Sequence, residues 1–332
     1  MIVVAGEALV DLVVRADGAV DARLGGGPYN AARTLARLGA PTTFFGGLGR
    51  DRFGRLLGDA LEAEGVALGG AGRSATPTTL ALVDLDQAGV ASYSFYLTGT
   101  AAAEPDYPAL AAGYAAATTR ALDAPDGAGR GIFAVHVGAL GLVMEPIGAA
   151  IERLLLTDVP PGTLVMLDPN CRPGAIGDRA AYLARIERIA ARADVVKASV
   201  EDIAYLHPGW PPSEAAAALL AAGSSLVLVT DGGRPARAFL PGATLTVEVP
   251  SVVVVDTIGA GDAFGGGFLA WWHANGLSRD DLRRPAPVRA AVQAAAAAAA
   301  VTCTRPGADP PTLAELRASN QWPALPPTGS VG

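Results

Sequence analysis

Short apolar runs alternate with longer amphipathic stretches along most of this 332-residue chain. Strands are predicted where the apolar runs are short, at residues 2–5, 9–14, 41–49 with its glycine turn, 132–137, 164–167, 194–197, 226–230 and 244–248. Helices are predicted where apolar residues recur every three or four positions, at 25–39, 51–65, 145–157, 178–193, 213–222, 262–275 and 288–301. This alternation favours an α/β fold in which a parallel-dominated sheet is flanked by helices on both faces.

Three stretches depart from the alternation. In residues 76–97, two β-rich arms surround "DQAG" (86–89), which predicts a hairpin in a separate small sheet. The alanine-rich stretch 101–130 is predicted to be loose. From about residue 321 the chain is rich in proline and glycine, so residues 321–332 are expected to form a flexible tail.

The composition indicates a compact soluble protein, with 51% hydrophobic and 17% charged residues. A net charge of −7 argues against nucleic acid as a partner, because phosphate-backbone binding needs a basic face. Two distant cysteines suit a reducing cytosol. The apolar start carries Glu7 and Asp11 and no basic leader, which favours a strand over a signal peptide. With the alanine-rich run 290–301 too short to span a bilayer, we expect a cytoplasmic protein with no membrane partner.

Lys197 is the only lysine in the chain and follows two valines, so there is no Walker-A loop, which requires a lysine after glycine. The three histidines form no pair with metal-binding spacing. A P-loop kinase is therefore excluded, and a histidine-based zinc site is disfavoured.

The stretch "VDTIGAGDAFGGGF" (255–268) places Asp262 inside a glycine turn that opens a predicted helix. Amide groups at such a turn bind phosphate, which a carboxylate would repel. The pattern is explained if the amides of residues 259–262 hold a phosphoryl group while Asp262 removes a proton from the attacking hydroxyl. A plain turn with Asp262 as helix N-cap is the alternative, and a dinucleotide-binding fingerprint fails because Phe264 stands where glycine is needed.

Two segments resemble signatures of the ribokinase-type carbohydrate kinases, also called the phosphofructokinase-B family. They are "DTIGAGDAFGGGF" near the C-terminus and "GGGPYNAARTLARLG" (25–39) near the N-terminus. Segments similar to the fructokinase branch are "GEALVDL" (6–12), "TPTTLALVDLD" (76–86), "DPNCR" (168–172) and "ADVVKASVEDIAYL" (193–206). The resemblance covers nearly the whole chain, apart from 101–130 and the tail. It implies one ribokinase-like domain over 1–320, with a β-sheet lid from about 9–24 and 76–97 that pairs into a homodimer.

The resemblance also implies roles for individual residues. Asp262 would be the catalytic base, and Gly259, Ala260 and Gly261 would form the anion hole. The positions that match the family's sugar contacts are Asp11, Gly26 and Asn30. For Asn30 the alternative is a helix N-cap.

Asp168, Asn170 and Arg172 follow an apolar strand at its carboxyl end, where α/β sheets bind ligands. Asn170 and Arg172 are candidates to reach phosphates or an acidic sugar substituent. The alternative is a turn that Asp168 stabilises.

On the nucleotide side, Thr230 and Gly232 in "TDGGRP" (230–235) resemble the family's turn against ATP, although Pro235 replaces a glycine and is expected to stiffen the loop. Lys197 is a candidate for a phosphate contact or for a structural ion pair. Ser199 begins a Ser-x-x-Asp match in which Asp202 replaces the usual glutamate, so either Asp202 or the adjacent Glu201 would reach Mg²⁺ through water. Asp256 matches a position that helps to bind a monovalent cation such as K⁺ in relatives, and its alternative is a strand-end turn.

Together these features predict an ATP- and Mg²⁺-dependent kinase that phosphorylates a small sugar, with fructose first. The alternatives are the same chemistry on 2-keto-3-deoxygluconate, ribose or a nucleoside, and a non-catalytic regulator that binds sugar or nucleotide. A 6% aromatic content without an evident stacking cage near Asp11 or Asn30 argues against nucleosides. The intact glycine turn with Asp262 argues against a non-catalytic protein.

Overall fold

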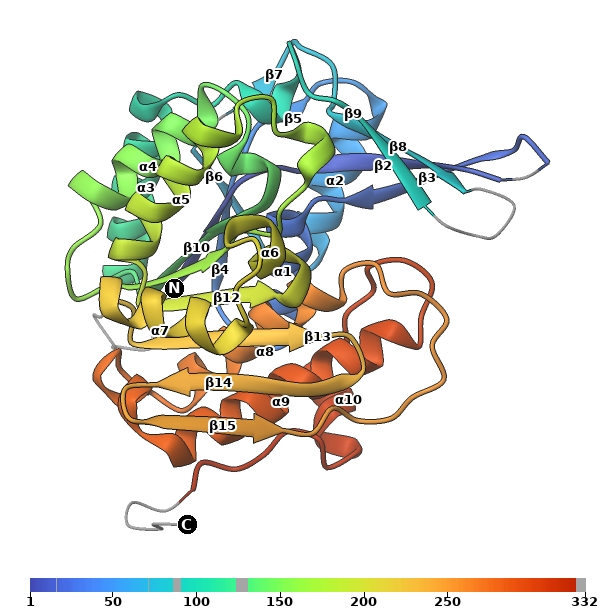
Figure 1. Ribbon diagram of the computed structural model, residues 1–332. Coiled ribbons are helices and arrows are strands. Elements are labelled where there is room, and N and C mark those ends of the chain that lie inside the picture. The colour runs from blue at the N-terminus through green and yellow to red at the C-terminus, as the bar shows by residue number, and fades with distance from the viewer. Residues whose placement is uncertain (16, 71, 86–90, 124–130, 327–332) are drawn as a thin grey trace.

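A nine-stranded sheet forms the centre of the protein, in a computed structural model that describes residues 1–15, 17–70, 72–85, 91–123 and 131–326 (Figure 1). Its strand order is β15-β14-β13-β12-β11-β10-β1-β4-β6. Neighbouring strands run parallel except at β13–β14 and β14–β15. The strands are β1 (Ile2–Ala5), β4 (Thr42–Phe45), β6 (Ala67–Gly69), β10 (Ala134–Gly138), β11 (Leu164–Asp168), β12 (Val195–Ser199), β13 (Leu226–Asp231), β14 (Arg234–Leu240) and β15 (Ala243–Val247). This confirms the predicted parallel-dominated sheet.

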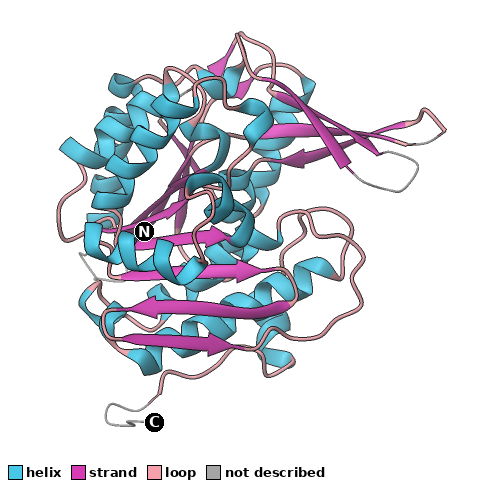
Figure 2. Cartoon of the chain, viewed as in Figure 1, coloured by secondary structure: helices cyan, strands magenta, loops and turns pink. Residues whose placement is uncertain are grey.

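Helices cover both faces of this sheet, as Figure 2 shows. One face carries α1 (Gly27–Arg37), α2 (Arg52–Ala63), α8 (Ala260–Ala274) and α9 (Pro285–Cys303). The other carries α3 (Tyr107–Leu122), α4 (Ile147–Thr157), α5 (Arg179–Arg192), α6 (Val200–Leu206) and α7 (Pro212–Ala222). Alternate residues of β1 enter different cores, Ile2 and Val4 on the first side and Val3 and Ala5 on the second. That is the period-two pattern of a strand buried on both faces.

One helix in the described part of the chain, α9, is long and apolar enough to cross a membrane by length and composition alone. Within the fold, 67% of that apolar window is buried. Nearly every alanine of α9 lies in the core beside Phe268 and Trp272 of α8. Burial inside a domain therefore accounts for its apolar character.

A second, four-stranded sheet projects from one end of the body (Figure 1). Its strands are β3 (Val20–Gly25), β2 (Leu9–Val14), β8 (Leu80–Leu85) and β9 (Ala91–Tyr96), in that order. The predicted small sheet is thus confirmed, with β8 and β9 paired antiparallel. The "DQAG" turn at 86–89 lies outside the described residues. Two shorter strands, β5 (Leu48–Gly49) and β7 (Arg73–Ser74), also pair.

Several elements were not predicted from the sequence, among them α3, α6 and β14. The stretch expected to be loose contains α3, whose alanine-rich composition gives little amphipathic contrast. Helix α6 is short and follows β12 directly. Strand β14 includes Pro235, so the expectation that this proline stiffens a loop is wrong: the turn ends at Gly233.

The start of the expected tail contacts the core. Trp271 in α8 donates an indole N–H to Pro323 O at 2.8 Å, and Trp322 packs against the buried cluster around α8 and α9. A short helix, α10 (Leu313–Ala318), precedes this segment. Residues 327–332 lie outside the described chain.

Candidate active site

A cavity of about 300 Å³ opens at the carboxyl edge of the parallel strands. Strand β1 lies between β10 and β4, so the chain connections diverge at the β1–β10 boundary, the point where open α/β sheets bind ligands. The cavity is lined by Glu7, Leu9, Asp11, Gly26, Gly27, Asn30, Tyr93, Phe95, Ala139, Leu140, Asn170, Arg172, Thr257, Ile258, Gly259, Gly261 and Asp262. Its walls come from the small sheet, from α1 and from the start of α8, and its volume suits a small polar ligand.

Asp262 lies in this cavity and does not cap its own helix. The N-cap of α8 is Gly259, with φ 76°, and no side chain caps this helix end. The Asp262 side chain instead accepts hydrogen bonds from Asn30 Nδ2 at 2.9 Å and from Asn170 Nδ2 at 3.4 Å. The plain-turn alternative is therefore wrong.

Burial changes the acidity of Asp262. The residue is only 8% exposed, and burial raises the pKa of its carboxyl to about 6, with Asp168 adding to the rise. The hydrogen bond from Asn30 and the charges of Lys197 and Arg172 oppose the rise. A carboxylate whose pKa is near neutrality can accept a proton from a hydroxyl group and release it again.

The first turn of α8 provides backbone amides beside Asp262. Such amides have no partner within their own helix and carry the positive end of its dipole. Gly259 and Gly261 line the cavity, whereas Ala260 lies behind them with its amide 3.3 Å from Thr257 O. Side chains here would collide, because a Cβ on Gly259 would lie 2.5 Å from Ala308 Cβ. The turn can hold an anion through Gly259 and Gly261, whereas the amide of Ala260, expected in the anion hole, donates to Thr257 O instead.

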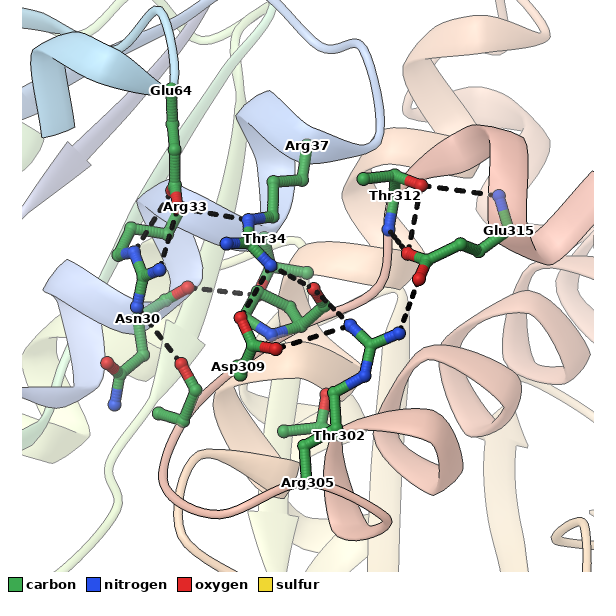
Figure 3. Close-up of polar contacts among 12 residues, drawn as sticks. Asn30, Arg33, Thr34, Arg37, Glu64, Thr302, Arg305, Asp309, Thr312 and Glu315 are labelled. Carbon is green, nitrogen blue, oxygen red and sulfur yellow. Dashed lines mark hydrogen bonds and ion pairs between the residues drawn. The ribbon is translucent and has the colours of Figure 1, made fainter. Parts of the chain in front are cut away.

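A network of ion pairs holds the turn at residues 305–310 in place (Figure 3), and Ala308 of this turn lies against Gly259. Arg33 and Arg37 of α1 both bind Glu64, which caps the end of α2. Arg33 also donates to Ala308 O at 3.0 Å, and Arg37 donates to Asp309 Oδ1 at 2.7 Å. Arg305 extends the network to Asp309 and Glu315. Helix α1 thus supports the anion-binding turn as well as supplying Asn30.

The predicted sugar-contacting residues all line the cavity: Asp11, Gly26, Asn30, Asn170 and Arg172. Burial raises the pKa of Asp11 to about 6 against the opposing charges of Arg172 and Arg23. Asn30 lies one turn inside α1, whose N-cap is Gly26, so the N-cap alternative for Asn30 is wrong. Among the described buried atoms, Asn30 Oδ1 has no hydrogen-bond partner, which leaves it available to a ligand hydroxyl.

The lining residues that were not identified from the sequence include Glu7, Tyr93 and Phe95. Tyr93 and Phe95 point from the same side of β9 and stack with their ring centroids 5.9 Å apart. Their alternation along a strand was a usable signal, but nothing local showed that β9 reaches this cavity. The expectation that no stacking residues lie near Asp11 and Asn30 is therefore wrong. The aromatic content of the chain does not argue against a nucleoside ligand.

Lys197 and Asp168 form a buried ion pair, with Lys197 Nζ 2.7 Å from Asp168 Oδ2. Both residues are 3% exposed. The structural ion pair expected for Lys197 is therefore present, and Asp168 pairs with Lys197 instead of stabilising a turn. The pair lies under the anion-binding turn, because a Cβ on Gly261 would be 3.3 Å from Lys197 Nζ.

Ser199, Asp202 and Thr230 occupy the neighbouring strand ends. Ser199 is the N-cap of α6 and forms a capping box with Asp202, whose other oxygen accepts from Cys171 N at 2.6 Å. Glu201, beside it, is exposed. Ser199 pairs in register with Thr230 of β13, and Gly232 with φ 54° forms the following turn. These residues lie along the carboxyl edge but do not line the described cavity.

Asp256 is engaged by protein groups on both oxygens. Oδ1 accepts from Ile258 N at 3.0 Å, which is the geometry of a turn aspartate. Oδ2 accepts from Arg23 Nη1 and from Gly307 N, both at 2.8 Å. Within the described residues, no group of three or more His, Cys, Asp or Glu side chains is placed to hold a metal ion. The geometry matches the turn alternative, although no strand precedes Asp256.

Comparison with known proteins gives a consistent family match. Residues 1–121 and 162–315 match the family described as pfkB family carbohydrate kinase. A fructokinase from Rhizobium leguminosarum bv. trifolii is 37% identical over 274 residues, 81% of this chain and 79% of that protein. The structure of fructokinase with bound ATP from Xylella fastidiosa has a TM-score of 0.85 and 29% identity, covering 96% of this chain and 98% of that one. Fructokinase from Vibrio cholerae O395, in a fructose, ADP and calcium ion bound form, has a TM-score of 0.80 and 26% identity over 96% and 97% of the two chains.

Proposed function

The chain belongs to the pfkB family of carbohydrate kinases, and we propose that it transfers the γ-phosphoryl group of ATP to a hydroxyl group of fructose. The fold is ribokinase-like and the protein is a sugar kinase. One observation carries the proposal furthest: Asp262 faces a small polar cavity at the helix N-terminus where a phosphoryl group would bind. Relatives with bound fructose, ADP or ATP support the choice of substrates.

In the proposed mechanism, Asp262 removes the proton from the attacking hydroxyl group as the phosphoryl group moves. Asn30 Nδ2 holds Asp262 Oδ2 in place. The amides of Gly259, Gly261 and Asp262 stabilise negative charge on the phosphoryl oxygens. Asp11, Asn30 and Arg172 hold the sugar hydroxyl groups, and the small sheet covers the cavity as a lid that excludes competing water.

We propose that Mg²⁺ arrives with ATP. Nucleotide-bound Mg²⁺ keeps several waters and takes only one or two protein carboxylates, so a dedicated cluster is not required. Both oxygens of Asp202 already accept hydrogen bonds from Ser199 and Cys171, whereas the carboxylate of the adjacent Glu201 is exposed. We therefore assign the water-mediated contact to Glu201. When bound, the ion neutralises charge on the phosphates. Thr230 and Gly232, at the same edge, are proposed to contact the nucleotide.

A sugar panel tests the proposed function. Purified protein with ATP and Mg²⁺ is expected to release ADP fastest with fructose, measured against ribose, 2-keto-3-deoxygluconate and nucleosides at equal concentration. The stacked pair of Tyr93 and Phe95 makes a nucleoside the second candidate, because aromatic rings favour a planar base. ADP release that no acceptor stimulates would favour the non-catalytic alternative.

Asp256 matches a position that helps to bind a monovalent cation in relatives. Here we expect its charge to be balanced by Arg23, whose side chain is 35% exposed. Replacing Arg23 with methionine should therefore increase the advantage of K⁺ over choline by about 1.4- to 5-fold in kcat/KM, the range expected from a partly exposed ion pair worth about 0.2–1 kcal/mol. Arg15→Met is the control, because Arg15 directly follows β2 of the small sheet but pairs with Asp21. An unchanged ratio in Arg23→Met would show that Arg23 does not compensate Asp256.

We further propose that the enzyme is a cytoplasmic homodimer that pairs through the small sheet. Val20 and Tyr96 lie on the face of this sheet opposite to Tyr93 and are 54% and 56% exposed. Large apolar and aromatic side chains left in water favour burial against a partner. Light scattering of the full chain measures the mass directly, and a monomer at micromolar concentration would contradict this assignment.

A further inference from the structure

We propose that Glu7 is a positioning residue that fastens together the two backbone segments forming the wall of the sugar cavity next to Asp262. The inference rests on the proposed function, because it assigns the cavity to the sugar. Glu7 follows β1 and is 1% exposed. The mechanism above gives it no part.

The carboxylate of Glu7 joins segments that are far apart in the sequence. Oε1 accepts from Gly27 N at 2.9 Å and Oε2 accepts from Gly141 N at 2.7 Å. Among the described residues no arginine or lysine pairs with Glu7, so these amides replace a counter-ion. A buried carboxylate without a cation is costly, and burial raises the pKa of Glu7 to about 8. A cost of that kind suggests a requirement beyond ordinary packing.

The first of these segments carries the residues closest to the proposed base. Gly27 opens α1, and its N-cap Gly26 has no side chain with which to cap the helix, so Glu7 caps α1 from outside. Asn30 follows one turn later. Gly27 also lies close beside the base, since a Cβ there would lie 3.3 Å from Asp262 Oδ1 and 3.0 Å from Ala139 Cβ. A shift of Gly27 would therefore displace Asn30 and change the size of the space beside Asp262.

The second segment holds a strained backbone. Ala139 has φ 53° and lines the cavity. A non-glycine residue in this left-handed region is strained and persists only where its surroundings hold it. Gly141, two residues after Ala139, is held by Glu7 Oε2. The Ala139 turn and the start of α1 therefore lie together beside Asp262, and Glu7 accepts a hydrogen bond from each of these two segments.

A carboxylate is suited to this task in a way that its amide is not. The two N–H donors approach different oxygens. A carboxyl group, ionised or protonated, can accept on both oxygens, whereas an amide group has only one acceptor oxygen. Glutamine would place an NH₂ group opposite one of the N–H groups, leaving a buried donor without a partner. Such a loss costs about 1–3 kcal/mol.

Glu7→Gln is therefore expected to lower kcat/KM for the sugar by about 5- to 150-fold, the equivalent of that loss, while KM for ATP stays within twofold. Asp194→Asn is the matched control. Asp194 is also a buried carboxylate, 2% exposed, that accepts from a backbone amide, Val165 N. It differs from Glu7 in pairing with Arg192 and Arg279, and it lies at the opposite end of the strands. The control is expected to lower Tm without a selective effect on the sugar. A folded Glu7→Gln variant with sugar kcat/KM within threefold of wild type would overturn the proposal.

Amide hydrogen exchange in the wild-type protein tests the same contact without any variant. The first amide of a helix ordinarily lacks a partner and exchanges quickly. The proposed contact predicts that Gly27 and Gly141 exchange as slowly as the amides of β10, and rapid exchange at either glycine would overturn it. A sugar panel without activity in the wild type would contradict the proposed function but leave this exchange result unaffected.

Discussion

Replacing Asp262 with asparagine is expected to lower kcat by about 10²- to 10⁴-fold, the usual contribution of a positioned general base. Asparagine keeps the size of the side chain but cannot accept a proton. Because the backbone amides of α8 remain, KM for ATP should change by no more than about twofold. Steady-state ADP release with saturating fructose measures the effect.

The pH dependence gives an independent check. Burial raises the pKa of Asp262 to about 6, so the base is ionised above that pH and becomes protonated as the pH falls through it. Wild-type kcat should therefore decline below about pH 6. The residual kcat of Asp262→Asn should not decline in this way as the pH falls. Asp11, whose pKa is also about 6, would still affect KM for the sugar.

Asp51→Asn is the matched control for this variant, because Asp51 caps α2 and lies outside the cavity. It should leave kcat near the wild-type value. An Asp262→Asn enzyme that released ADP as quickly as wild type would remove Asp262 from the role of base.

The predictable part of this site is the part encoded by neighbouring residues. The glycines around Asp262 specify an anion-binding turn because both the tight turn and the free amides are local properties. Asn30 and Asp11 were identified from segments that resemble the family. By contrast, the identity of the Lys197 partner depends on Asp168, which is 29 residues away on another strand. Composition and spacing could not choose between a phosphate contact and an ion pair.

Each feature that escaped prediction did so for a physical reason. Helix α3 is rich in alanine and threonine, so its buried and exposed faces differ little in hydrophobicity. Strand β14 begins with Arg-Pro, a pair that usually marks a turn. Pro235 lies at the β-bulge between β13 and β14 and before the first residue that pairs with β15, so its missing N–H is tolerated. Glu7 lies between two apolar strands, and only the fold brings Gly27 and Gly141 to it.

Replacing Lys197 with methionine is expected to destabilise the protein by about 3–5 kcal/mol, because it leaves the charge of Asp168 buried and unpaired. Asp168 already has a pKa raised by burial, and Lys197 is the nearest group that lowers it. The double variant Lys197→Met with Asp168→Asn removes both charges and should recover most of the loss. Urea unfolding of the three proteins at one pH measures the difference.

The same pair of variants separates the two roles that the sequence left open for Lys197. If the lysine serves only the ion pair, the double variant should recover KM for ATP together with its stability. If the ammonium group also binds phosphate, KM for ATP should stay raised in the double variant, since no cation replaces it. Lys197 is 3% exposed and bound to Asp168 at 2.7 Å, so we expect recovery of both. A stable double variant with KM for ATP raised tenfold or more would instead place the ammonium group at the nucleotide.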